Sequence, residues 1–437
     1  MHELRKNARV LGAALTGTTV EFYDFYVYAI AAALVFGPLF FPAESLQAQN
    51  LLAFMSFGLA FLARPLGAVA FGHFGDRIGR KSTLVASLLL MGGSTLLIAF
   101  LPTYASMDKH GIGWVAPLLL CILRFGQGLG LGGEWGGAAL LAVENAPPGW
   151  EARFGSAPQF GAPLGFLAAN GLFLLLGLGL SEVDFLAWGW RVPFLASALL
   201  VAVGLWVRLQ IAETPAFRTA RETAPPPTVP FGALLRQHTG AVLAGSAAVI
   251  ACFAIFYLST AYALSFATTE RGFARQDFQL VLLGAILFLA LGIAIAAWAS
   301  DRFGARRVMA WGAGATVVLG LGFGPILTHA SLTAIFVLLG LALLTMGFVY
   351  GPLGGFLSAL YPVPVRYTGV SVAFTLGGIV GGALTPIAAQ AMGATGQGDR
   401  VGWLLCAAGV LTLIGVLRSH PHQNTSSSFP RKREPSS

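Results

Sequence analysis

Twelve apolar stretches follow one another along this chain, with short polar segments between them. They lie near residues 10–36, 51–73, 82–101, 114–142, 155–180, 192–209, 240–266, 279–298, 308–327, 332–357, 369–391 and 402–417. A helix of about 20 apolar residues crosses a bilayer once. Only 10% of the residues are charged, against about 25% in soluble proteins. We therefore predict an all-α membrane protein with twelve transmembrane helices.

A charged, proline-rich segment from Arg208 to His238 separates the first six stretches from the last six. Its composition is typical of a linker. The chain after Arg418 is rich in Ser, Pro, Lys and Arg, which predicts disorder. The predicted organisation is a six-helix half over residues 1–209, a cytoplasmic linker over 210–238, a second six-helix half over 239–417, and a disordered cytoplasmic tail over 418–437.

The basic residues indicate which loops share a face of the membrane. The formal net charge is +8, and most Lys and Arg residues lie in alternate loops and at the two ends of the chain. By the positive-inside rule, this asymmetry places both termini in the cytoplasm. The positive charge therefore reports membrane topology, and we expect no nucleic-acid partner.

One loop motif occurs twice, at corresponding places in the two sets of six. The first copy is GHFGDRIGRK, from Gly72 to Lys81, and the second is ASDRFGARR, from Ala299 to Arg307. Duplicated halves are common in transporters, whose substrate sites lie where the repeats meet. A loop with a carboxylate among arginines predicts ion pairs that form in one conformation and break in another. The alternative is that such a loop is basic only to orient the protein.

Five charged residues fall inside the predicted spans, all in the first half: Glu21, Asp24, Arg64, Arg124 and Glu134. Each costs roughly 2.5–3.5 kcal/mol at a helix centre, so such residues face one another or a watery cavity. Helical spacing adds Tyr28 and Gln127 to their faces. The two arginines fit an anionic substrate, whereas the three acids fit proton coupling. The alternative is that these residues form buried ion pairs that only fix helix packing.

Uncharged polar residues in the spans are weaker candidates. Gln159 and Asn170 lie in the fifth stretch, where an amide is as often an interhelical hydrogen bond as a ligand. In the second half, the deep polar groups are hydroxyls and amides such as Tyr257, Tyr350 and Gln390. We interpret the aromatic residues among them as core or interface anchors.

Five stretches resemble the major facilitator superfamily and, within it, the metabolite:proton symporter family of shikimate, alpha-ketoglutarate, citrate and proline/betaine carriers. They are Gly17–Tyr28, Phe61–Lys81, Arg124–Pro147, Trp188–Phe194 with Ala212–Phe217, and Tyr361–Phe374. The resemblance covers nearly the whole chain. It implies alternating access of the two halves and proton-driven symport.

The resemblance also assigns residues to a cytoplasmic gate. The expected gate comprises Gly72, Asp76, Arg77, Gly79, Arg80, Glu144 and Arg153, with Asp301, Arg302 and Arg306 from the second copy of the loop. The expected substrate-binding residues are Arg64, Arg124, Gln127, Tyr28, Gln159 and Asn170. Glu21, Asp24 and Glu134 are the expected proton-coupling residues.

The sequence therefore predicts proton-coupled uptake of a small carboxylate by a monomer in a bacterial inner membrane, without a cofactor. The alternative is a proton- or sodium-coupled carrier of an osmolyte such as proline or betaine. An enzyme is not expected, because no motif such as His-Glu-x-x-His occurs. The cysteines, Cys121, Cys252 and Cys406, each lie in an apolar run, so neither a disulfide framework nor a metal site is expected.

Overall fold

The computed structural model describes residues 2–43, 45–78, 80–132, 134–147, 149–210 and 230–419, and these residues are nearly all helical. The α-helices are α1 (His2–Ala31), α2 (Gly37–Phe40), α3 (Leu46–Ile78), α4 (Arg80–Ile98), α5 (Tyr104–Asp108), α6 (Val115–Leu131), α7 (Glu134–Glu144), α8 (Glu151–Ser156), α9 (Gly161–Gly179), α10 (Glu182–Ala187), α11 (Val192–Gln210), α13 (Pro230–Gln237), α14 (Thr239–Tyr257), α15 (Ala263–Thr269), α16 (Arg275–Phe303), α17 (Ala305–His329), α18 (Leu332–Tyr350), α19 (Leu353–Ser358), α20 (Val363–Gly378), α21 (Thr385–Ala394) and α22 (Gly402–Arg418).

The predicted fold class is confirmed. Eleven helical segments of the described chain are long and apolar enough to cross a membrane, and a shorter apolar helix covers Val85–Ile98. This shorter helix corresponds to the third predicted span, which was expected over residues 82–101. The whole of α4 runs from Arg80 to Ile98, in agreement with that expectation.

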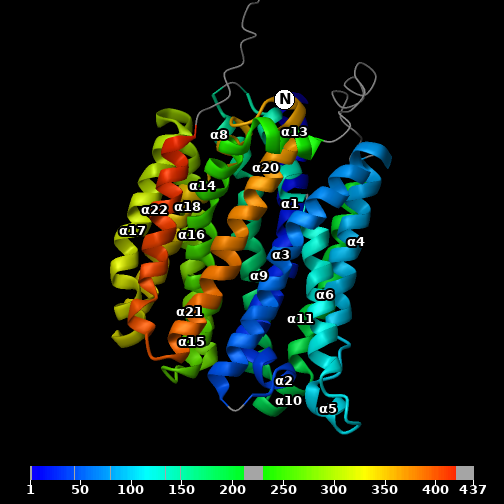
Figure 1. The fold of residues 1–437 in the computed structure, drawn as a ribbon, viewed down its shortest axis with the longest axis vertical. Helices are drawn as coiled ribbons and strands as arrows, with labels where there is room; N and C mark the ends of the chain where they lie inside the picture. The colour runs from blue at the N-terminus through cyan, green and yellow to red at the C-terminus, as the bar shows by residue number, and fades with distance from the viewer. Residues whose placement is uncertain are drawn as a thin grey trace, which may run out of the picture.

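The helices form one bundle in which the first half lies beside the second (Figure 1). Helices α8 and α13 lie at one end, which we call the terminal face because the N-terminus lies there. Helices α5 and α10 lie at the other end, which we call the opposite face. A continuous apolar core joins the halves, with Phe25 and Phe57 on one side and Phe253 and Tyr257 on the other.

Glycines let pairs of spans approach at backbone distance in both halves. In the first half, a Cβ on Gly128 of α6 would lie 2.3 Å from the carbonyl oxygen of Ala60 in α3. In the second half, a Cβ on Gly347 of α18 would lie 2.4 Å from the backbone carbon of Gly292 in α16. Such contacts between small residues are the usual way in which membrane helices associate, because lipid provides little hydrophobic drive.

Substituting Gly128 with alanine is therefore expected to destabilise the first half. The added methyl group meets backbone atoms, which cannot move aside as a side chain can, and overpacking of this kind costs about 1–3 kcal/mol. Gly93→Ala is the matched control, because a Cβ there meets nothing within 4 Å. Thermal unfolding in detergent should show a lower transition temperature for Gly128→Ala, and equal temperatures for the two variants would contradict the expectation.

Three spans contain a π-helical segment where they pass between the halves. These segments are η1 (Ala32–Phe36) after α1, η4 (Leu258–Tyr262) after α14 and η5 (Ile379–Leu384) after α20. A π-bulge widens a helix locally and is frequent at functional sites. Here η1 and η4 interrupt the first and seventh spans, so corresponding helices of the two halves carry the same irregularity.

The expected linker over 210–238 lies partly outside the described residues, which omit 211–229. Its last part forms the helix α13, although its composition predicts no helix. Pro230 stands at the first position of α13, where the fixed φ of proline favours a helix start, and Leu234 is buried. Of the expected tail, Arg418 belongs to α22 and residues 420–437 lie outside the described residues.

Candidate functional site

The structure buries all five charged residues that the sequence places inside the spans. Their exposed fractions are 4% for Glu21, 1% for Asp24, 4% for Arg64, 0% for Arg124 and 6% for Glu134. These five are the whole set of buried acids and bases in the described chain, and all come from helices before residue 211. The second half therefore faces them with uncharged residues.

The two arginines lie against the same aromatic ring. The guanidinium carbon of Arg64 is 4.5 Å from the ring centroid of Phe25, and that of Arg124 is 4.2 Å from it. Arg124 also lies 4.0 Å from the ring centroid of Tyr28. The negative faces of aromatic rings stabilise a desolvated cation, so these rings allow two cations to stay close together inside the bundle.

A chain of hydrogen bonds joins Arg124 to Asp24 through three helices. Arg124 Nη1 donates to Gln127 Oε1 at 2.9 Å, Gln127 Nε2 donates to Thr95 Oγ1 at 2.7 Å, and the Thr95 hydroxyl lies 3.3 Å from Asp24 Oδ2. Among the described residues, Arg124 Nη2 and Asp24 Oδ1 have no hydrogen-bond partner. This series of hydrogen bonds thus connects a guanidinium group to a carboxyl group, and each group keeps one atom that can form a further hydrogen bond.

Arg64 is the centre of a second polar group. It lies near Glu21 of its own half and near Tyr257 and Tyr350 of the other half. Glu134 opens α7 and is followed by Trp135, whose indole Nε1 donates to Gln159 Oε1 at 3.1 Å. Glu21 thus lies near Arg64, whereas Asp24 lies near the Thr95 hydroxyl. The two acids have different surroundings, although they lie one turn apart on α1.

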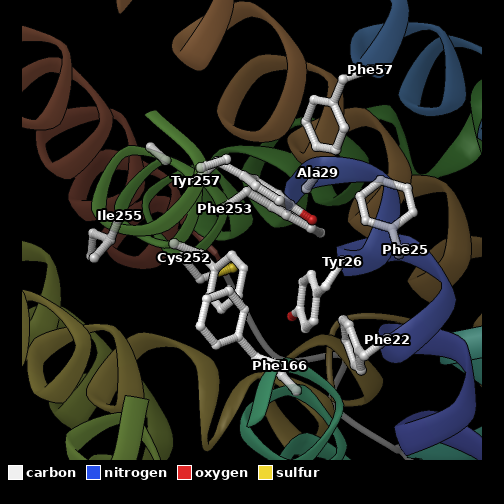
Figure 2. Close-up of a cluster of buried hydrophobic side chains, with 14 of the residues drawn as sticks. Phe22, Phe25, Tyr26, Ala29, Phe57, Phe166, Cys252, Phe253, Ile255 and Tyr257 are labelled. Atoms are coloured by element: carbon white, nitrogen blue, oxygen red, sulfur yellow. The ribbon is translucent and has the colours of Figure 1, made fainter. Parts of the chain in front are cut away.

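A small cavity lies between the halves, and its lining includes Tyr257 and Tyr350 but none of the five buried charged residues. Its volume is about 10 Å³, close to the space that the centre of one water molecule needs. Figure 2 shows Phe22 and Tyr26 from α1, Phe166 from α9, and Cys252 and Tyr257 from α14 gathered in this region. The cavity is lined by Phe22, Tyr26, Ala162, Cys252, Phe253, Phe256, Tyr257, Met346, Tyr350 and Phe374.

Contacts between the halves close the cavity toward the terminal face. The rings of Trp135 and Phe374 stack with centroids 3.7 Å apart, and Phe374 lines the cavity. Nearer the terminal face, Arg153 Nε lies 3.1 Å from Asp301 Oδ2, and the backbone N–H of Ala152 donates to Asp301 Oδ1 at 2.9 Å. We call the Arg153–Asp301 pair the terminal latch.

A second group of contacts between the halves lies toward the opposite face. Asn170 Nδ2 donates to the carbonyl oxygen of Gln279 at 3.0 Å, and Gln279 Nε2 donates back to Asn170 Oδ1 at 3.3 Å. Beyond them, Arg275 Nη2 pairs with Glu182 Oε2 at 3.0 Å. Both groups of contacts are formed at once, so the described residues join the halves on both sides of the cavity.

Some expected site residues therefore have structural partners in this state. Tyr28 shares a hydrogen bond of 2.8 Å with Ser56 within the first half. Gln159 accepts from Trp135, and Asn170 bonds to Gln279. None of these three residues lines the cavity. Their assignment to substrate binding stays a prediction.

Of the expected gate, the structure brings together only Arg153 and Asp301. Glu144 is exposed at the end of α7. Arg302 lies near the rings of Trp298 and Phe303, and Arg306 donates to the carbonyl oxygen of Leu417, so both make contacts within the second half. Gly79 lies outside the described residues, as do the side chains of Asp76, Arg77 and Arg80 and the surroundings of Gly72.

Breaking the terminal latch is expected to expose the cavity. Cys252 lines the cavity and is 1% exposed, so its reaction with a thiol reagent reports opening. In a background of Cys121→Ser and Cys406→Ser, Asp301→Asn should raise its labelling rate about two- to fivefold, since a partly exposed ion pair contributes about 1 kcal/mol or less. The exposed Arg307→Gln is the control. An unchanged rate in Asp301→Asn would show that the latch does not hold this state closed.

Several residues of this region were not predicted from the sequence. Thr95 was not singled out, and Tyr257 and Tyr350 were interpreted as core or anchor residues, yet both line the cavity. The tyrosines do pack in the core, as expected, and their position between the halves also places them at the cavity. Trp135 directly follows Glu134 in the sequence. Its position next to a predicted site residue was the signal that could have identified it.

Comparisons with known proteins agree with this architecture. Residues 10–224 match the family described as Sugar (and other) transporter, and residues 244–436 match the Major Facilitator Superfamily. The chain is 44% identical to the inner membrane metabolite transport protein YhjE of Escherichia coli, over 96% of this chain and 95% of that protein.

More distant relatives have named substrates. The chain is 38% identical to the shikimate transporter of Escherichia coli over 89% of this chain and 88% of that protein. It is 30% identical to the proline/betaine transporter of the same organism, over 87% and 77%. A solved structure of the proton:xylose symporter XylE covers 94% of each chain with a TM-score of 0.75 at 16% identity, which shows a shared fold.

Proposed function

We propose, from the premise that this chain belongs to the major facilitator superfamily of membrane transporters, that it is a proton-coupled symporter of a small carboxylate metabolite. The terminal face is then cytoplasmic, and both termini lie inside the cell. The halves open the cavity alternately to the two sides of the inner membrane. The inward proton gradient then drives uptake of the substrate.

The observation that carries this proposal is the hydrogen-bonded chain from Arg124 to Asp24. Arg124 supplies a buried cation with an NH₂ group available for a carboxylate oxygen. Guanidinium groups suit this role because they present several donors in a fixed plane. At the other end of the chain, Asp24 bonds to the Thr95 hydroxyl. Binding at one end can therefore alter the hydrogen bonding, and with it the protonation, of the other.

We assign the coupling proton to Asp24. Its carboxyl group contacts the hydroxyls of Thr95 and Ser197, whereas Glu21 interacts electrostatically with Arg64. Asp24 can thus gain or lose a proton without breaking an ion pair. Arg64 and Glu21 then complete the substrate site from the side of the tyrosines, and Glu134 remains a candidate for passing the proton on toward the terminal face.

The test is reconstitution in liposomes that enclose a pH dye, followed by addition of a panel of carboxylates and betaine without sodium. Acidification of the lumen with one carboxylate, lost in Arg124→Ala and in Glu21→Gln, supports proton symport. No acidification with any carboxylate, together with uptake that requires sodium, would contradict proton coupling and leave the fold unaffected.

The second candidate is an osmolyte carrier for proline or betaine. Proline/betaine transporters are among the relatives, and the cavity is rich in aromatic rings, which can bind quaternary ammonium groups. Uptake of betaine that rises with external osmolality would favour this candidate over the first.

A further inference from the structure

The second half contributes one wall of the cavity, and the side chains of this wall limit which chemical groups a substrate can have besides its carboxylate. From that half come Cys252, Phe253, Phe256, Tyr257, Met346, Tyr350 and Phe374. These side chains are apolar apart from the two phenol hydroxyls and the thiol. The thiol is already in use, since Cys252 Sγ donates to the carbonyl oxygen of Val249 at 2.9 Å. A bound molecule therefore meets mainly rings and methylene groups on this side.

The buried charges come from the first half and lie beside the cavity, not among its lining residues. Among the described residues, the buried set contains two cations, Arg64 and Arg124, and three acids, Glu21, Asp24 and Glu134. When all five are ionised the sum is +2 − 3 = −1. One carboxylate can enter if one acid takes up a proton. Arg64 already lies near Glu21, which leaves Arg124 for one carboxylate. A second carboxylate would need another proton and another cation, and the wall from the second half offers no cation.

Several of the aromatic rings are also poorly placed to form a cage around a ligand cation, because neighbouring groups cover their faces. Tyr26 stacks on Phe22 at 5.5 Å and on Phe256 at 4.7 Å between ring centroids, and Trp135 stacks on Phe374 at 3.7 Å. The face of Phe25 already receives the guanidinium groups of Arg64 and Arg124. Cation–π binding needs an open ring face, so the wall suits an uncharged body better.

We infer that the substrate is a monocarboxylate whose remaining body is uncharged and mainly apolar, such as a small ring or a branched chain. Dicarboxylates and quaternary ammonium compounds are then poor substrates, and each bound molecule is accompanied by one proton. This inference rests on the proposed function and narrows it to one chemical class.

Binding to the full-length protein in detergent tests the inference with two matched pairs of ligands. Cyclohexanecarboxylate and trans-cyclohexane-1,4-dicarboxylate differ by a second carboxylate. 3,3-Dimethylbutanoate and glycine betaine have the same shape and differ by a positive charge. Trp135 reports binding through tryptophan fluorescence because it stacks on a ring of the cavity, and a weakly buffered solution reports proton uptake.

We expect cyclohexanecarboxylate to bind at least about 30-fold more tightly than the dicarboxylate, and 3,3-dimethylbutanoate at least about tenfold more tightly than betaine. One proton should be taken up per bound molecule. Arg124→Gln should lose this binding, whereas the exposed Arg307→Gln should keep it.

Two results would overturn the inference. Tighter binding of the dicarboxylate with proton uptake would refute it while leaving proton-coupled carboxylate transport intact. Tighter binding of betaine than of 3,3-dimethylbutanoate would refute the inference that the body of the substrate is uncharged, and it would favour the osmolyte carrier. If no carboxylate binds and no proton is taken up, the proposed function itself fails.

Discussion

Replacing Arg124 with glutamine is expected to lower carboxylate uptake at least about 30-fold, because removing one partner of a buried charged contact costs about 2–5 kcal/mol. Arg124 is fully buried and holds Gln127 and the carbonyl oxygen of Phe57 through separate N–H groups. Glutamine removes the charge and leaves Gln127 without its donor. Initial rates of uptake into liposomes at equal protein content give the measurement.

Arg124→Lys separates charge from geometry in the same assay. Lysine keeps the positive charge, but its compact ammonium group does not reproduce the planar set of donors. We expect uptake between that of the native protein and that of Arg124→Gln. The exposed Arg307→Gln is the matched control for loss of an arginine, and thermal unfolding checks that each variant folds. Uptake by Arg124→Gln within threefold of the native rate would refute a role in substrate binding.

Much of the fold was accessible from sequence because a bilayer constrains a chain strongly. Apolar stretches of sufficient length indicate spans directly, and eleven of them recur as long helices with the shorter Val85–Ile98 as the twelfth. Charges such as Arg124 stand out for the same reason, since lipid penalises them. The burial of all five expected charged residues follows from this rule alone.

The site residues that were not predicted are uncharged, so lipid does not penalise them as it does a charged side chain. Thr95 can bond to its own helix, and its hydroxyl does donate to the carbonyl oxygen of Met91 at 3.0 Å, so a threonine in an apolar helix gives no warning. Its bond with Gln127 depends on how α4 and α6 pack. Spacing along one helix predicts which residues share a face, but it does not predict which residue of another helix they meet.

Contacts between the halves were the least predictable part. The stacking of Trp135 on Phe374 and the pairing of Asn170 with Gln279 join residues more than 100 positions apart. The repeated loop did indicate that Asp301 would have a partner at the terminal face, and the resemblance assigned Arg153 to the same gate. The pairing of these two residues is visible only in the structure.

Replacing Asp24 with asparagine is expected to abolish proton-driven accumulation of the substrate while leaving exchange of substrate across the membrane nearly intact. Asparagine has the shape of a protonated aspartate, and its carbonyl oxygen can still accept from Thr95, so folding and the hydrogen-bonded chain should survive. It does not release a proton, however, and the gradient then no longer drives transport. Accumulation should fall at least about a hundredfold, equivalent to 2.7 kcal/mol or more of lost driving force.

Two assays in the same liposomes distinguish this outcome from simple inactivation. Uptake driven by an imposed pH gradient should be lost in Asp24→Asn, whereas counterflow of labelled substrate at equal pH should stay within about threefold of the native rate, a difference of less than 1 kcal/mol. Glu21→Gln and Glu134→Gln are the matched variants of the other two buried acids. If Glu21→Gln alone separates the two assays, the coupling proton belongs to Glu21, and the acid bonded to Thr95 serves only to position Arg124.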